Sequence, residues 1–187
     1  ALVAAGVLAF GVLAVLLAPH LGVTGGASGN ESDIGESMTA SFSAGLHVGN
    51  VHLAYRFDGP EYNDVNEVAR LPATLFGGGT LSSTLTAIGA TTAIASMGSA
   101  GIVAGQDANS VGAALWSWDN PFGNALVTSI KFEALAGLPA PGCGVCNNQS
   151  DYSLYSVAAA VPEPGSVALM AAGLAVMGFV ARRRRSA

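Results

Sequence analysis

Residues 38–57 read MTASFSAGLHVGNVHLAYRF and carry the clearest strand pattern of the chain. Apolar or small residues alternate with serine and threonine before Gly49-Asn50, and larger apolar residues alternate with other side chains after it. Such an alternation is typical of a β-strand with one buried face. Because Gly-Asn between two strand patterns indicates a tight turn, the stretch predicts a β-hairpin in which Val48 lies opposite Val51 on the core face.

Other segments further along the chain also favour strands. Residues 126–133 alternate cleanly, and residues 111–118, across the turn-rich loop 119–124, are expected to pair with them. Residues 152–157 predict a last strand. Residues 77–105 are rich in glycine, alanine, serine and threonine without a clear period, and their β-branched side chains favour strand.

These patterns predict an all-β fold for residues 38–160, namely an antiparallel β-sandwich of the jelly-roll type. Residues 28–37, acidic and rich in glycine and serine, are expected to form a flexible leader to this domain. Residues 28–161 contain three basic residues against eleven acidic ones, a net charge of −8. An acidic body argues against a nucleic-acid partner, because phosphates need a basic surface.

The apolar character of the chain is concentrated at its two ends. The sequence of 187 residues is 51% hydrophobic and only 10% charged, which argues against an ordinary cytoplasmic enzyme. Residues 1–18 contain no charge and would form a helix about 27 Å long. Since Gly25 and Ala27 fit the small residues before a cleavage site, residues 1–27 are expected to be a secretory signal peptide. An uncleaved signal-anchor is the alternative, because the apolar run is long for a signal.

A second uncharged run, residues 165–181, ends at four arginines, Arg182, Arg183, Arg184 and Arg185. As a helix it spans about 25 Å, and snorkelling arginines extend its reach toward the ~30 Å of a hydrocarbon core. A buried core helix is the alternative, but such a helix rarely lacks a polar face over its whole length. The run therefore predicts a transmembrane helix, and the positive-inside bias places the arginines in the cytoplasm and the body on the far side.

Two prolines precede this helix in the sequence Val161-Pro162-Glu163-Pro164. Proline fixes its own φ and biases the residue before it toward extended backbone, which suits the groove of a processing enzyme. Glu163 places a negative charge near the N-terminus of the following helix, where the helix dipole favours it.

Together, Val161–Pro164, the apolar helix and Arg182–Arg185 resemble the PEP-CTERM sorting signal of Gram-negative bacteria. The resemblance covers about the last 27 residues; the same segment also goes by the name ice-binding protein C-terminal domain, which does not imply ice binding. It implies export, retention in the inner membrane in transit, and processing near Pro162-Glu163-Pro164 by an exosortase-type enzyme, followed by location at the cell surface or outside the cell. In such bacteria the system accompanies exopolysaccharide and biofilm formation, so a structural protein of the surface or extracellular matrix is expected.

Two pairs of residues in the body are candidates for further roles. Cys143 and Cys146 have CxxC spacing, and in an exported protein they are expected to form a disulfide, with free thiols or a Cys/His zinc site as alternatives. Trp116 and Trp118 share one face of a strand. They belong either to the core or to a platform on which sugar rings stack, which would make the body a carbohydrate-binding module for exopolysaccharide.

Metal sites and catalysis find little support in the sequence. In the expected hairpin His47 and His52 lie opposite each other, but a zinc site needs three or four ligands. The oxygen-rich residues 58–67 fit either a weak calcium site or a solvated turn. No catalytic motif of the common hydrolase or nucleotide-binding kinds occurs. We therefore expect no metal, no cofactor and no enzymatic activity.

Overall fold

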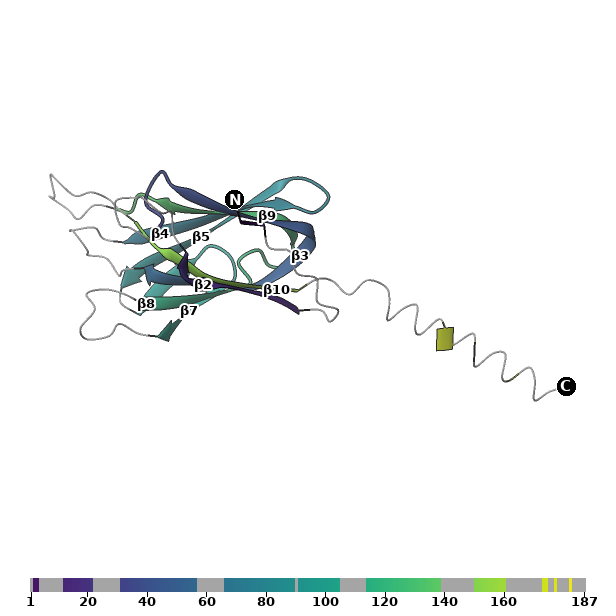
Figure 1. Ribbon diagram of the computed structural model, residues 1–187. Coiled ribbons are helices and arrows are strands. Elements are labelled where there is room, and N and C mark those ends of the chain that lie inside the picture. Colours follow the sequence, from purple (N-terminus) through teal and green to yellow (C-terminus); the bar gives the residue numbers. More distant parts are fainter. Residues whose placement is uncertain are drawn as a thin grey trace.

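The computed structural model describes residues 2–3, 12–21, 31–56, 66–89, 91–104, 114–138 and 150–160, with residues 173, 174, 177 and 182 of the C-terminal segment (Figure 1). Within these residues the β body has ten strands. In chain order they are β1 (Leu2–Val3), β2 (Val12–Leu21), β3 (Ser37–Arg56), β4 (Glu67–Leu75), β5 (Thr80–Gly89), β6 (Thr92–Ala95), β7 (Ser99–Ala104), β8 (Ala114–Asp119), β9 (Leu126–Leu135) and β10 (Ser153–Ala160).

All ten strands belong to one sheet, in the order β2-β10-β3-β9-β4-β5-β6, with β8 pairing with β3 and β7. Every pair is antiparallel except the short parallel pair of β1 with β3. The all-β antiparallel prediction is therefore confirmed. The strands nevertheless form a single, nearly closed, barrel-like sheet rather than the two separate sheets of a sandwich.

The long strand β3 accounts for this difference. Its residues 37–47 pair with β9, and its residues 50–56 pair with β8 along the same edge. In Figure 1 it passes from the layer of β4, β5 and β9 to the layer of β2, β7, β8 and β10. One strand thus belongs to both layers and joins them into one sheet.

The predicted hairpin at Gly49-Asn50 is wrong, because both residues lie inside β3. Val48 pairs with Ala159 and Val51 with Val157, while Asn50 pairs with Ala158, so Gly49 is an extra residue without a partner on β10. This is a β-bulge, which changes the phase of the alternation in the middle of a strand. Val48 and Val51 consequently both point into the core, as they would have done across a hairpin.

The expected pairing of residues 111–118 with residues 126–133 is also wrong. The described part of the first segment, β8, pairs with β3 and β7, whereas β9 pairs with β3 and β4. Asn120 and Gly123, at φ values of 49° and 56°, turn the chain between them. The loop therefore forms a corner that leads from one half of β3 to the other.

At the N-terminal end, Val12–Leu21 form strand β2 beside β10 in this structure, whereas the sequence predicts an apolar helix over residues 1–18. The helix stays a prediction for this segment in a membrane. A helix satisfies its own backbone groups, whereas here the edge of β10 provides partners for them. Residues 31–36 are not a loose leader, because the Ser32 N–H donates to the Tyr152 carbonyl at 2.8 Å and both Ser32 and Asp33 are buried.

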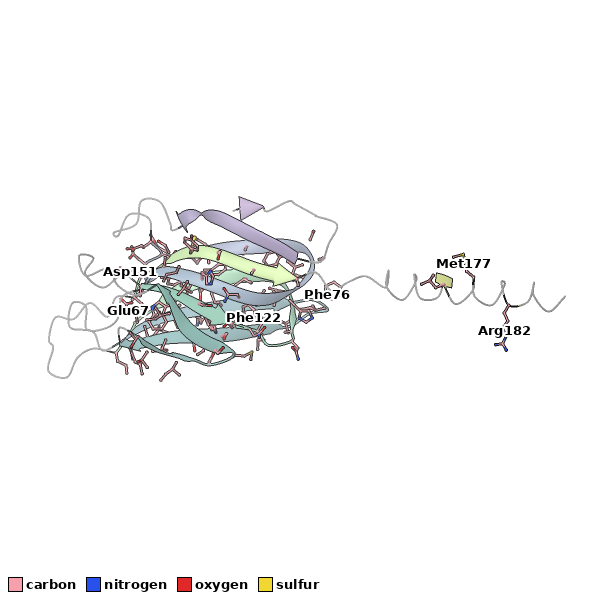
Figure 2. The ribbon with its side chains drawn as sticks, turned by 90° about the horizontal axis from the view of Figure 1, so that it is seen from below. Glu67, Phe76, Phe122, Asp151, Met177 and Arg182 are labelled. Atoms are coloured by element: carbon pink, nitrogen blue, oxygen red, sulfur yellow. The ribbon has the colours of Figure 1, made fainter. Side chains whose placement is uncertain are left out.

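The core lies inside the nearly closed sheet and contains large side chains from both layers. The largest buried aromatic residues are Trp116, Trp118, Tyr152, Phe122 and Phe132. Burying one such side chain stabilises the fold by roughly 1.5–3 kcal/mol. Figure 2 shows Phe122 directed into the body and Phe76 at one end of it.

On the outside of the sheet, Glu133 of β9 binds two of the three basic side chains of the acidic body. Arg70 of β4 donates from Nε at 2.8 Å and from Nη2 at 2.5 Å to one oxygen, and Lys131 pairs with the other. Burial raises the pKa of Glu133, but the bonds from Lys131 and Arg70 outweigh it and hold the pKa below its usual value.

Gly98 occupies a turn between β6 and β7 that a larger residue would not tolerate. Its φ is +74°, and a Cβ there would lie 2.6 Å from the Asn120 carbonyl oxygen and still closer to that of Asp119. We expect Gly98→Ala to lower the free energy of unfolding by about 2–3 kcal/mol. Gly78→Ala is the control, since its φ is also positive but its Cβ meets no atom within 4 Å; a loss of about 1 kcal/mol is expected. Urea denaturation measures both, and equal losses would contradict the close contact.

Candidate sorting and processing site

The C-terminal segment leaves the body from strand β10, which is paired on both sides. Its last residue, Ala160, pairs with Val12 of β2 and His47 of β3. Leu154, Val157 and Ala159 anchor the strand in the core. Two residues after Ala160 in the sequence, Pro162 has no N–H to donate to a neighbouring strand.

The sorting residues themselves fall mostly outside the part of the chain that the structure describes. This applies to Val161–Pro164, to Arg183–Arg185 and to most of residues 165–181, so the transmembrane helix stays a prediction. Gly173, Leu174, Met177 and Arg182 are described and are helical. Within the described residues, no helix has the length and hydrophobicity needed to cross a bilayer.

The apolar side chains that are described in this segment do not pack against the β body. Leu174 and Met177 are exposed to 60% and 67%. Figure 2 shows Met177 and Arg182 well away from the sheet. The alternative of a helix buried in the core therefore fails for these residues.

The end of the body from which this segment departs carries an exposed aromatic residue. Phe76, in the turn after β4, is 62% exposed, and its N–H donates to the Leu126 carbonyl at 2.8 Å. It lies against Gly45, where an added Cβ would be 2.7 Å from the Phe76 side chain. Gly45 is two residues from His47, the partner of Ala160, so Phe76 and the start of the C-terminal segment share one rim of the barrel.

Trp116 and Trp118 are core residues, and the sugar-stacking platform is wrong. Their exposures are 1% and 0%, and the Trp118 Nε1–H donates to the Met97 carbonyl at 2.9 Å. The strand alternation placed both rings on one face, but only the pairing of β8 with β3 and β7 decides that this face is the inner one. A carbohydrate-binding module built on these two residues is thereby excluded.

The two histidines lie on the outer side of one strand instead of facing each other across a hairpin. His52 Nδ1 is 2.9 Å from Ser156 Oγ of β10, and its ring centroid is 6.3 Å from that of Tyr155. His47 lies between β9 and β10 further along β3. Among the described residues, no three His, Cys, Asp or Glu side chains gather in a way that could hold a metal ion.

A polar cluster next to His52 was missed by sequence reasoning. Asn50 donates through Nδ2 to Ser117 Oγ at 2.5 Å and also to Asp119, and Ser117 Oγ donates to Asp119 Oδ1 at 3.2 Å. The hairpin prediction assigned Asn50 to a turn, so no local signal linked it to β8. The cluster connects β3 to β8 through side chains.

Two further candidates lie outside the described residues. The predicted disulfide between Cys143 and Cys146 stays a prediction, as does the calcium site for residues 58–65. Of that oxygen-rich stretch, Asn66 and Glu67 are described, and both are buried. The Asn66 side-chain oxygen accepts a hydrogen bond from the Leu138 N–H at 2.9 Å, which is a structural contact.

Comparison with known proteins identifies the C-terminal segment. A family model described as the PEP-CTERM protein-sorting motif matches residues 160–185, starting at the last residue of β10. No curated protein and no solved structure matches the chain. This motif implies an exported protein that an exosortase processes. The chain thus carries a PEP-CTERM protein-sorting motif at residues 160–185.

Proposed function

We propose that this protein is a structural component of the cell surface or extracellular matrix, held in the inner membrane in transit and then released or re-anchored. The observation that carries the proposal is the sorting motif at residues 160–185, which begins where the β body ends. In this proposal the C-terminal segment directs the protein to its location, and the β body performs the function there. The β body has a structural rather than a catalytic role, and it contacts other copies of this protein or other components of the extracellular matrix.

The chemistry of the segment supports a sequence of events. Residues 1–27 direct export, and residues 165–181 then stop in the bilayer because Arg182–Arg185 favour the cytoplasmic side. Pro162 and Pro164 keep the backbone extended at the outer surface, where the processing enzyme reaches it. Glu163 keeps this stretch out of the hydrocarbon, because burial of a carboxylate in lipid is costly.

The features of the body support a structural role. The sheet is nearly closed, and large side chains fill its interior. Such close packing makes the body rigid. On the outer face, the His52 ring lies 2.9 Å from Ser156 Oγ and packs near Tyr155, so it is held against strand β10. An acidic net charge suits an exported protein that must stay soluble until it assembles.

The proposal is tested by the intact mass of the protein recovered from membranes and from culture medium. In the medium, the protein is expected to lack the helix and arginines that follow the processing site, and a strain without exosortase is expected to accumulate the uncut form. Glu163→Ala should slow processing by about tenfold if the enzyme recognises this carboxylate, a change of about 1.4 kcal/mol in transition-state binding, so the uncut form should accumulate. Glu36→Ala, which removes the same charge outside the motif, should be processed normally. Released protein that still contains Arg182–Arg185 would contradict the proposal.

A further inference from the structure

Strand β2 covers an edge of the sheet that would otherwise be open. It is the last strand in the sheet order, and its only neighbour in that order is β10. The pairing is antiparallel and continuous over five positions, from Ser156 opposite Leu16 to Ala160 opposite Val12. β10 pairs with β3 on its other side, so within the described part of the chain β2 is the strand that covers the outer edge of β10.

The residues of β2 belong to the predicted signal peptide, residues 1–27. Its removal during export takes Val12–Leu21 away from the body. The backbone N–H and C=O groups that β10 directs toward β2 then lose their partners. Unpaired groups along a strand edge readily pair with another strand.

The exposed edge would have few of the features that keep strand edges apart. Residues 153–160 read SLYSVAAA and contain no charge and no proline. A single register shift, between Leu154 and Ser156, interrupts the strand before its regular part. Edges of monomeric proteins are usually protected by lysine, proline or bulges, so this edge is suited to pairing.

We propose that in the exported protein β10 pairs with β10 of a second copy of this chain, antiparallel and about a two-fold axis. The proposal rests on the proposed function, because it requires cleavage of the signal peptide. The register with β2 demonstrates that this edge of β10 accepts an antiparallel strand. An antiparallel pair of two β10 strands gives hydrogen-bond partners to the edge backbone groups of both copies. Since β10 is uncharged, the two copies bring no like charges together.

The side chains of β10 fit such a continuation of the sheet. Val157 and Ala159 are buried, and Ala158 between them is half-buried on the outer face. The outer face next to the edge is therefore small and apolar at Ala158, where a neighbouring strand meets no bulky side chain. A lysine at this position would place two ammonium groups in one short interface, in the way that natural edge strands avoid association.

The experiment compares Ala158→Lys with a matched control, Thr86→Lys. Thr86 is also half-buried between two buried residues, Leu85 and Ala87, but its strand has partners on both sides. Protein recovered from the medium is examined by intact mass and by light scattering after size-exclusion chromatography. We expect a dimer without residues 12–21 for the wild type and for Thr86→Lys, and a dissociation constant raised by about tenfold or more for Ala158→Lys.

Hydrogen exchange of the wild type gives a second test that needs no variant. Among residues 156–160, the amides that point away from β3 should be protected in a concentration-dependent manner, because only the dimer gives them partners. The amides that point toward β3 should be protected at any concentration. Exported protein that retains residues 12–21, or that lacks them and stays monomeric, would overturn the edge proposal and leave export intact. A dimer unchanged by Ala158→Lys would overturn it too. A protein that is never exported or cut would instead overturn the proposed function, and this proposal with it.

Discussion

Replacing Arg182, Arg183, Arg184 and Arg185 by glutamate is expected to remove the protein from the membrane fraction. The change turns four positive charges into four negative ones directly after the apolar run. Each basic residue near an anionic membrane surface contributes about 1 kcal/mol to the free energy of membrane binding. The four arginines together therefore contribute about 4 kcal/mol, which is close to a thousandfold in the binding constant. The orientation signal is lost as well, because acidic residues contribute little to it. Fractionation of cells followed by immunodetection measures the change.

The matched control replaces the same four arginines by lysine. Lysine keeps the positive charge and can also extend its ammonium group to the membrane surface. Membrane retention of this variant should stay near the wild-type level. If the glutamate variant is retained as well as the lysine variant, the cationic end does not hold the segment, and the sorting interpretation of residues 182–185 is wrong.

Trp118→Ala is expected to have the largest effect on the stability of the body. The side chain has no exposed surface, and its loss leaves a large cavity between β3, β7 and β8. The Met97 carbonyl loses its indole partner at the same time. Such substitutions lower the free energy of unfolding by about 3–5 kcal/mol, which urea denaturation of the released protein would detect.

Ile94→Ala provides the control for this measurement. Ile94 is apolar and lies on a strand, but it is 59% exposed, so its truncation should change stability by less than about 0.5 kcal/mol. A sugar-binding platform would give the opposite pattern, in which Trp118→Ala folds normally. A loss below about 1 kcal/mol would contradict the buried position of Trp118.

The all-β class could be predicted because alternation is a local property of each strand. Residues 126–133 and 152–157 both fall within or next to observed strands, β9 and β10. The connections could not be predicted in the same way. At Gly49 a hairpin and a bulge produce the same change of phase, and only the distant strand β10, which pairs with both sides of the bulge, favours the second.

The sorting segment could be identified from sequence because its proline motif, apolar run and arginines follow one another along the chain. None of the three needs a tertiary contact to be recognised. The tryptophans show the opposite case, since their role depends on which side of β8 faces the other strands. The apolar residues 12–21 depend on their surroundings as well. A run of valine, leucine and alanine suits a helix in lipid, yet it also suits a strand beside β10.

In the membrane-held form that we propose, the shared rim of Phe76 and Ala160 restricts how the β body is oriented on the bilayer before processing. Four residues, 161–164, separate Ala160 from the start of the predicted helix at residue 165. The five steps from residue 160 to residue 165 cover at most about 3.5 Å each in an extended chain, or some 17 Å. The rim that carries Phe76 would therefore lie close to the lipid headgroups, at the depth where aromatic rings are favoured. In this arrangement we expect the processing enzyme to reach Val161–Pro164 along the plane of the membrane, because the barrel would cover this stretch from the other side.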